Sequence, residues 1–142
     1  MLEINNAKDF VRNNLFKEVR EDFRQVKQNT KPQNKLIPQI STSQIRKFLS
    51  AVNKINNKIK YQNDSDILSE DIVAEIAYMR VQFAYIVGKN KIGKNKNGSF
   101  EKLHEELDKA MIEIKNSKSK FINFARYVEA IVAYHKFYGG ND

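Results

Sequence analysis

The sequence predicts an all-α protein, a single small helical bundle of about five helices. Apolar residues recur at helical steps along most of the chain, and strand-like alternation is almost absent. The 142 residues include only 5 Gly and 2 Pro, which disfavours a loop-rich β fold. A chain of this length can bury one core, so we expect a single domain, with an N-terminal helical segment at residues 1–30 and the main bundle at residues 39–140.

The first segment carries a diffuse helical pattern. Its apolar residues lie three to five positions apart and comprise Phe10, Leu15, Val19, Phe23 and Val26. This spacing predicts a helix over about residues 7–28. Both prolines, Pro32 and Pro38, fall in the stretch that follows, so residues 30–38 are interpreted as a linker.

The second helix has the clearest start signal in the sequence. Ser41 is followed three residues later by Gln44, which is the pattern of a capping box. Ile40 and Ile45 can form the accompanying hydrophobic staple. One face then carries apolar residues at helical spacing: Ile45, Phe48, Leu49, Val52, Ile55 and Ile59. We expect this face to pack in the core.

Two further helices each follow a polar segment. After a polar loop at residues 61–68, Ser69 is expected to cap a third helix that ends at Gly88. Residues 89–98 are rich in Gly, Asn and Lys and are interpreted as a mobile basic loop, after which Ser99 caps a fourth helix. The apolar face of the fourth helix comprises Phe100, Leu103, Leu107, Ala110, Met111 and Ile114. Its other face carries acids that we expect to be solvated: Glu101, Glu105, Glu106 and Asp108.

The last helix, predicted over residues 120–138, is apolar almost all round. Such a helix lies at the centre of a bundle or pairs with a second protein. Gly139 and Gly140 end it. Tyr134, Phe137 and Tyr138 present more aromatic surface than a small bundle easily buries, so we predict a subunit interface there.

Positive charge is concentrated in one window of the chain. Between Asp22 and Asp64 there are nine basic residues and no acidic one, which accounts for the net charge of +8. Clustered Lys and Arg favour a polyanionic partner, because they release condensed counterions on meeting phosphates. A soluble basic surface without a partner is the alternative.

Part of this charge forms a row on the predicted second helix. The row consists of Arg46, Lys47, Lys54 and Lys58, and it has no carboxylates at helical spacing to balance it. The tyrosines Tyr61, Tyr78 and Tyr85 are candidates for stacking on nucleic-acid bases, although packing in the core is an equal alternative for each.

The sequence contains little that predicts catalysis or metal binding. His104 and His135 lack a metal-ligand spacing and are expected to be surface or interface histidines. The acids at residues 64–71 lack the order of a calcium-binding loop. There is no cysteine and no nucleophile or nucleotide-binding motif. We expect no enzymatic activity, no cofactor and no metal; a metal-free nuclease using either histidine is the weakest alternative.

Three segments resemble one protein family. They are residues 40–49 (ISTSQIRKFL), residues 78–85 (YMRVQFAY) followed by Gly88 and Lys89, and residues 124–140 (FARYVEAIVAYHKFYGG). They resemble the small subunit of type III-A CRISPR-Cas (Csm) effector complexes, and the resemblance extends from about residue 37 to the end of the chain. Residues 1–30 are variable in such proteins, and the loop at residues 89–98 is longer and more basic than expected.

The resemblance implies a specific role. Proteins of this family are small, all-helical and non-catalytic, and several copies stack beside the backbone subunits that hold the guide RNA. They hold target RNA along the guide RNA–target duplex in antiviral defence, while cleavage belongs to other subunits. The implied partners are target RNA, guide RNA, other copies of the chain, and the backbone and large subunits. No signal peptide or membrane-spanning stretch is recognisable in the sequence, so we expect a cytoplasmic protein with no membrane partner.

The RNA-binding hypothesis names six basic residues: Arg46, Lys47, Lys54, Lys58, Arg80 and Arg126. They would hold the phosphates of the target strand without reading its bases. For Arg80 and Arg126 the alternative is pairing with Glu75 or Glu129 inside the bundle. Two other function classes stay open: a helical adaptor for an acidic protein, and a DNA-binding regulator with a basic face.

Overall fold

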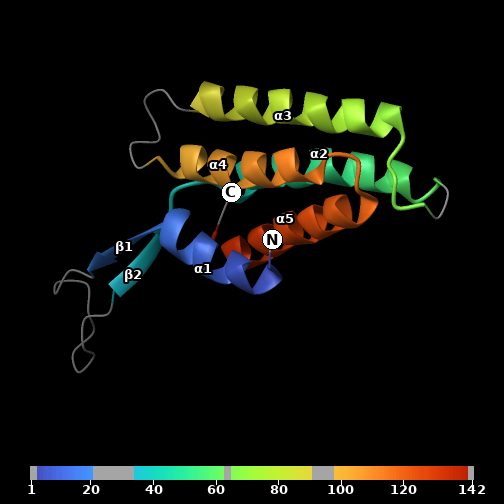
Figure 1. The fold of residues 1–142 in the computed structure, drawn as a ribbon. Coiled ribbons are helices and arrows are strands. Elements are labelled where there is room, and N and C mark those ends of the chain that lie inside the picture. The colour runs from blue at the N-terminus through green and yellow to red at the C-terminus, as the bar shows by residue number, and fades with distance from the viewer. Residues whose placement is uncertain (1–2, 21–33, 63–64, 91–97, 141–142) are drawn as a thin grey trace.

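The computed structural model describes residues 3–20, 34–62, 65–90 and 98–140 (Figure 1). These residues form five helices and one two-stranded sheet: α1 Ile4–Asn14, β1 Phe16–Arg20, β2 Asn34–Pro38, α2 Thr42–Ile59, α3 Glu70–Asn90, α4 Ser99–Ile114 and α5 Lys118–Phe137. The prediction of a small helical fold is confirmed, with the sheet as a minor addition to it.

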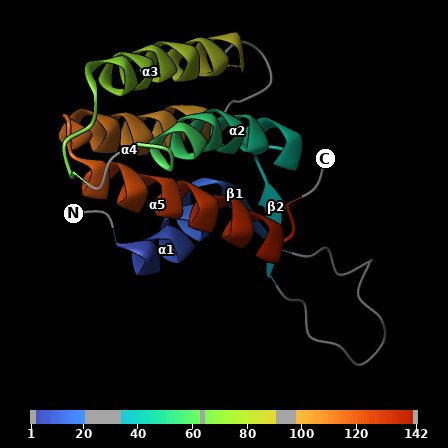
Figure 2. The same cartoon turned by 90° about the vertical axis from the view of Figure 1, so that its right-hand side faces the viewer.

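The helices are arranged in three layers. α5 packs against α1, α2 and α4, while α3 packs against α2 and α4. Figures 1 and 2 show α2 and α4 as a middle layer, with α3 on one side of it and α5 and α1 on the other. Because α3 is an outer layer, one of its faces can contribute to a molecular surface.

The core is built from the apolar faces predicted from the sequence. In α2 the predicted face is buried, with Leu49 packed at its edge. All the apolar residues predicted for α4 are buried as well. The Phe48 ring of α2 meets the Phe83 ring of α3 edge-on, at a centroid distance of 4.5 Å. This aromatic pair joins the middle layer to the outer helix.

Two of the three predicted serine caps are confirmed. Ser41 Oγ accepts a hydrogen bond from Gln44 N at 3.1 Å, and Gln44 Oε1 accepts one from Ser41 N at 3.0 Å, which completes the capping box. Ser69 Oγ accepts from Ile72 N at 3.3 Å at the start of α3. The prediction for Ser99 is wrong, because Gly98 holds the N-cap position of α4 with φ of 67°. Ser99 is the first helical residue, and it is buried.

The N-terminal part of the chain differs from the predicted long helix and linker. α1 ends at Asn14, and β1 pairs antiparallel with β2, with Phe16 opposite Pro38 and Arg20 opposite Asn34. Pro38 ends its strand, where a missing N–H is tolerated. The pairing joins segments separated along the chain, so helical spacing alone misreads residues 16–20. The remainder of the predicted helix and linker, residues 21–33, lies outside the described residues.

Two helix boundaries also differ from prediction. α3 continues through Gly88 to Asn90, and α5 begins at Lys118. Of the basic loop predicted at residues 89–98, residues 91–97 lie outside the described part of the chain.

The start of α5 is held by Asp66. Its carboxylate accepts hydrogen bonds from Ser119 N at 2.8 Å and from Ser117 Oγ at 3.2 Å. The hydrogen bonds from Ser119 are the largest influence on the pKa of Asp66, which lies below its usual value. Asp66 thus helps to hold the N-terminus of α5, beside the N-cap residue Ser117, which gives this acid a structural role.

The acidic face of α4 is less solvated than predicted. Glu106 Oε1 accepts a hydrogen bond from the buried Tyr127 Oη at 2.9 Å, and Asp108 forms an ion pair with Arg80 of α3. Glu105 is exposed, as expected. The acids at 106 and 108 therefore join α4 to its neighbours.

His135 is buried, which contradicts the prediction of a surface or interface histidine. Its Nε2 lies 2.7 Å from Ile40 O, and a carbonyl only accepts, so Nε2–H is the donor. Nδ1 has no hydrogen-bond partner among the described residues. The imidazole packs against the Phe16 ring at a centroid distance of 5.3 Å. The apolar spacing of the last helix places position 135 on the face that meets β1 and the start of α2.

Candidate nucleic-acid interface

A groove lies between α2 and α3 on the surface of the described residues. It has a volume of about 1270 Å³. The α2 wall includes the whole predicted basic row of Arg46, Lys47, Lys54 and Lys58. The α3 wall includes Tyr78, Val81, Gln82 and Tyr85. Four of the six predicted RNA-binding residues thus share one concave surface.

The basic wall follows from the helical period of α2. Lys47 and Lys54 are seven residues apart, so they lie on the same face, about 10 Å apart along the axis. The opposite face is the buried apolar one, which turns the lysines toward solvent. Arg46, Lys47 and Lys54 form no ion pair with any other described residue. These three cations are available for an external anion.

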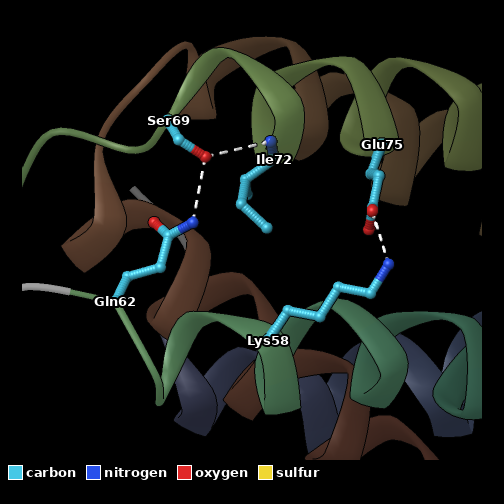
Figure 3. Close-up of polar contacts among 5 residues, drawn as sticks. All are labelled: Lys58, Gln62, Ser69, Ile72 and Glu75. Atoms are coloured by element: carbon cyan, nitrogen blue, oxygen red, sulfur yellow. Dashed lines mark hydrogen bonds and ion pairs between the residues drawn. The ribbon is translucent and has the colours of Figure 1, made fainter.

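Lys58 is engaged at one end of the groove. Figure 3 shows its Nζ reaching Glu75 Oε1 of α3, where the two form an ion pair. Beside this pair, Gln62 Nε2 donates to Ser69 Oγ at 2.9 Å (Figure 3). These contacts join the end of α2 and the loop after it to the start of α3. The sequence shows no carboxylate at helical spacing from Lys58 on α2; its partner Glu75 comes from the neighbouring helix instead.

Two contacts define how α2 and α3 lie against each other. Lys58 pairs with Glu75, and Phe48 packs on Phe83, so the two helices run antiparallel. Between these contacts, the register sets Lys54 across the groove from Tyr78. Seven residues further along each helix, the same register sets Lys47 across from Tyr85. Both walls therefore carry the same seven-residue repeat.

The tyrosines on the α3 wall are exposed. Tyr78 has 64% of its surface accessible and Tyr85 has 70%, so core packing is not the role of either ring. Val81 is 62% exposed between them. Tyr61 is also exposed, at 91%, but it does not line the groove. Of the three stacking candidates, the structure brings two to the basic row.

Arg80 is turned away from the groove toward α4. Its Nε donates to Asp108 Oδ1 at 2.7 Å, and its Nη2 donates to Asp108 Oδ2 at 3.2 Å. The hydrogen bonds from Arg80 lower the pKa of Asp108 and raise the pKa of Arg80 itself. Pairing inside the bundle is the alternative that the sequence offers to RNA contact by Arg80, with Glu75 or Glu129 as the partner. The observed partner is Asp108, which joins α3 to α4.

Arg126 lies apart from the other candidates. It is exposed on α5, in the layer separated from α3 by α2 and α4 (Figure 2). It does not line the groove. Any contact that Arg126 makes with RNA would involve a different surface of the molecule.

The aromatic residues predicted as an interface lie at the end of α5. Phe137 is 72% exposed, while Tyr134 and Tyr138 are half-buried against the core. The Tyr138 ring packs edge-on against Phe137 at 5.2 Å and against Phe16 at 6.1 Å, measured between centroids. Phe137 is therefore the member of the trio that offers a free aromatic face.

The described residues contain no group of three His, Asp or Glu side chains placed to hold a metal ion. His104 is half-buried on α4, away from the buried His135. Burial lowers the pKa of His135, and the hydrogen bond to Ile40 O offsets this only in part. None of the described helices has the length and apolar character required to cross a bilayer.

The groove itself was missed by sequence reasoning. The sequence predicts the lysine row and the tyrosines only as separate features, because nothing local in the chain shows that α2 and α3 lie side by side. One signal was present: Lys47 and Lys54, and Tyr78 and Tyr85, share a spacing of seven residues. Two equal repeats on successive helices are the pattern that a shared surface would require.

Comparison with known proteins gives consistent matches. The family model described as Csm2 Type III-A matches residues 17–141. A protein of Enterococcus italicus named CRISPR system Cms protein Csm2 is 33% identical over 130 residues, which cover 91% of this chain and 90% of that protein. The protein of the same name from Streptococcus thermophilus is 36% identical over 103 residues, covering 72% and 76%. The one from Mycobacterium tuberculosis is 27% identical over 104 residues, covering 73% and 79%. The matched region of the family includes both walls of the groove.

Proposed function

Because this chain belongs to the Csm2 family of type III-A systems, we propose that it is a non-catalytic RNA-binding structural subunit of a type III-A CRISPR ribonucleoprotein effector complex. In that role several copies stack in the complex and hold target RNA along the guide RNA–target duplex in antiviral defence. Its partners are the two RNAs, other copies of the chain, and the backbone and large subunits. The site of action is the cytoplasm.

The basic wall of the α2–α3 groove carries the proposal. Arg46, Lys47 and Lys54 are presented together, and no described carboxylate pairs with them. Contacts of this kind with phosphates position an RNA strand without reading its sequence. This suits a complex in which pairing with the guide supplies the sequence recognition.

The other predicted contacts have smaller or separate parts. Lys58 and Arg80 are each held in an ion pair, so each would have to leave a carboxylate before meeting a phosphate. Arg126, exposed on the far layer, would contact a different segment of the nucleic acid. Among the described residues lining the groove there is no histidine, and the carboxylate of Glu75 is paired with Lys58. The role assigned to the groove is therefore binding.

The first test is purification of the tagged chain from its native host, with sequencing of bound RNA and identification of bound proteins. The proposal expects short processed repeat–spacer RNAs together with a large subunit and backbone subunits. Recovery of the chain alone, or with unrelated proteins and no RNA, would contradict it.

The second test locates the phosphate contacts. We expect the double variant Lys47→Ala/Lys54→Ala to bind single-stranded RNA more weakly, with its log–log salt slope reduced by about 1.4, or about 0.7 for each lost contact. The matched control is Lys102→Ala/Lys109→Ala, which removes two exposed lysines, also seven residues apart, from α4. Equal effects of both variants would show that only net charge matters, and the groove would lose its assignment.

A further inference from the structure

We infer that the α2–α3 groove holds an unpaired stretch of RNA, with its phosphates on the lysines of α2 and its bases stacked on Tyr78 and Tyr85 of α3. This inference deepens the proposed function and rests on it, since both require RNA at the basic wall; the stretch in the groove is a part of the target RNA whose bases are not paired with the guide. It adds the kind of RNA segment that the groove accepts, and it assigns the two tyrosines a binding role.

The register of the two helices supports the inference. Since the Lys58–Glu75 and Phe48–Phe83 contacts set the alignment, each free lysine of the row faces one tyrosine. The pairs are Lys54 with Tyr78 and Lys47 with Tyr85, and they recur after about 10 Å along the helices. A nucleotide offers a phosphate and a base at a fixed separation, so a repeated cation–aromatic pair matches its two parts.

The exposure of the tyrosines supports stacking. Both tyrosines are largely exposed, Tyr78 at 64% and Tyr85 at 70% of the residue surface, while the other face of α3 is buried in the molecule. Between the walls lie apolar side chains, including Ile55, Met79 and Ile86. Surfaces that combine cations with exposed aromatic rings bind single strands, because every base has a face that can stack.

A fully paired RNA fits this arrangement less well. In a duplex the base faces are stacked on one another, and only the backbone and the groove edges are accessible. Such an RNA would reach the lysines and leave the tyrosines without a partner. At one end of the site Glu75 adds a carboxylate, which disfavours phosphate there and limits the strand to the part of the groove beside Lys47 and Lys54.

The test compares single-stranded and duplex RNA of the same sequence by fluorescence anisotropy with the full chain. Tyr78→Ala/Tyr85→Ala should bind the single strand at least about fivefold more weakly for each ring removed, since stacking of one base has at least that effect. Its salt slope and its affinity for duplex should stay unchanged. Tyr78→Phe/Tyr85→Phe keeps the rings and should bind as the unmodified chain does. Tyr61→Ala is the matched control, because it removes an exposed tyrosine outside the groove.

The outcomes separate the two proposals. If the alanine variant binds the single strand normally while Lys47→Ala/Lys54→Ala binds weakly, the stacking inference is wrong and the proposed function stands. If neither variant changes RNA affinity, both are wrong. If Tyr78→Ala/Tyr85→Ala loses affinity for the single strand and for the duplex to the same extent, stacking on unpaired bases is also wrong. If both variants bind RNA normally but fail to assemble onto purified partner subunits, the groove binds protein and not RNA.

Discussion

Lys54 and Lys58 lie four residues apart on one face of α2, yet their surroundings differ. Lys54 faces the groove without a carboxylate partner among the described residues, whereas Lys58 pairs with Glu75. The Lys58 side chain is 58% exposed and that of Glu75 is 36% exposed, so solvent screens this ion pair and it stabilises the fold weakly. The charge of a lysine therefore predicts phosphate binding only where neighbouring helices leave it unpaired.

Replacing Glu75 by Gln should release Lys58 into the groove. We expect tighter binding of single-stranded RNA and a log–log salt slope steeper by about 0.7, the contribution of one added phosphate contact. The free energy of unfolding should fall by no more than about 1 kcal/mol, as for other exposed ion pairs. Salt titrations of binding and urea unfolding measure the two effects. Glu105→Gln on α4 removes the same charge from an exposed site and should change neither; identical behaviour of the two variants would contradict the prediction.

His135 should make the fold sensitive to mild acid. Burial lowers the pKa of the folded-state imidazole, so the unfolded chain, with its histidine pKa near 6.5, binds the proton more readily. The free energy of unfolding should therefore fall as pH drops from about 6.5 toward 5, and this contribution should be constant at higher pH. Asp66 and Asp108 titrate further down, because their pKa values are lowered below 3.8.

Urea unfolding curves recorded between about pH 5 and pH 7.5, at steps of about half a pH unit, measure this dependence. His135→Gln can still donate to Ile40 O, and its stability should vary less with pH in that window, whatever its overall stability. His104→Gln serves as the matched control and should keep the dependence of the unmodified chain. Parallel curves for the unmodified chain and His135→Gln would show that another group is responsible.

At the scale of single elements, α3 is an outer helix of the described structure. It packs against α2 and α4 only through one face, and contacts at both ends of the groove hold it in register. The sequence pattern ended this helix at Gly88, because glycine commonly follows a helix C-terminus. In the structure the helix continues to Asn90, so Gly88 is a helical residue of the last turn, with the flexibility that glycine brings.

Gly88→Ala should therefore stabilise the protein. A Cβ at this position meets nothing within 4 Å, and alanine favours helix over glycine by about 0.5–1 kcal/mol. Urea unfolding should show an increase of that size in the free energy of unfolding. Gly140→Ala is the contrasting variant: its Cβ would lie 2.2 Å from His135 Nδ1, so it should destabilise by about 1–3 kcal/mol. A loss of stability in Gly88→Ala would mean that the helix ends where the sequence pattern indicated.

At the scale of the whole molecule, the fold separates two surfaces. The groove lies between the outer helix α3 and α2 of the middle layer, and α5 lies on the opposite side of that layer (Figure 1). The exposed Phe137 is the last residue of α5. A chain built in this way can bind RNA with one surface while it contacts another subunit with the other. This separation suits the proposed stacking of several copies along a strand.

Phe137→Ser should weaken contact between copies without unfolding the chain. Because 72% of its surface is accessible, the free energy of unfolding should change by no more than about 0.5 kcal/mol. Sedimentation velocity at high concentration, and the copy number in the purified complex, should both show reduced self-association. Ile112→Ser, which changes an exposed apolar residue of α4, is the control. A chain that stays strictly monomeric, alone and with its partners, would contradict the interface.

The sequence alone determined the local features of this protein. The helical faces, the caps at Ser41 and Ser69 and the basic row of α2 each depend on residues within a few positions of one another. The resemblance of three segments also predicted the family correctly, since the family model matches residues 17–141, which include all three.

Only the tertiary structure decided which distant residues meet. The pairing of β1 with β2, the Arg80–Asp108 and Lys58–Glu75 ion pairs and the hydrogen bond between His135 and Ile40, 95 residues away, join segments that no local pattern relates. The same holds for the groove, where the lysines come from one helix and the tyrosines from the next. Periodicity predicts the face that a residue occupies; packing between helices decides what that face meets.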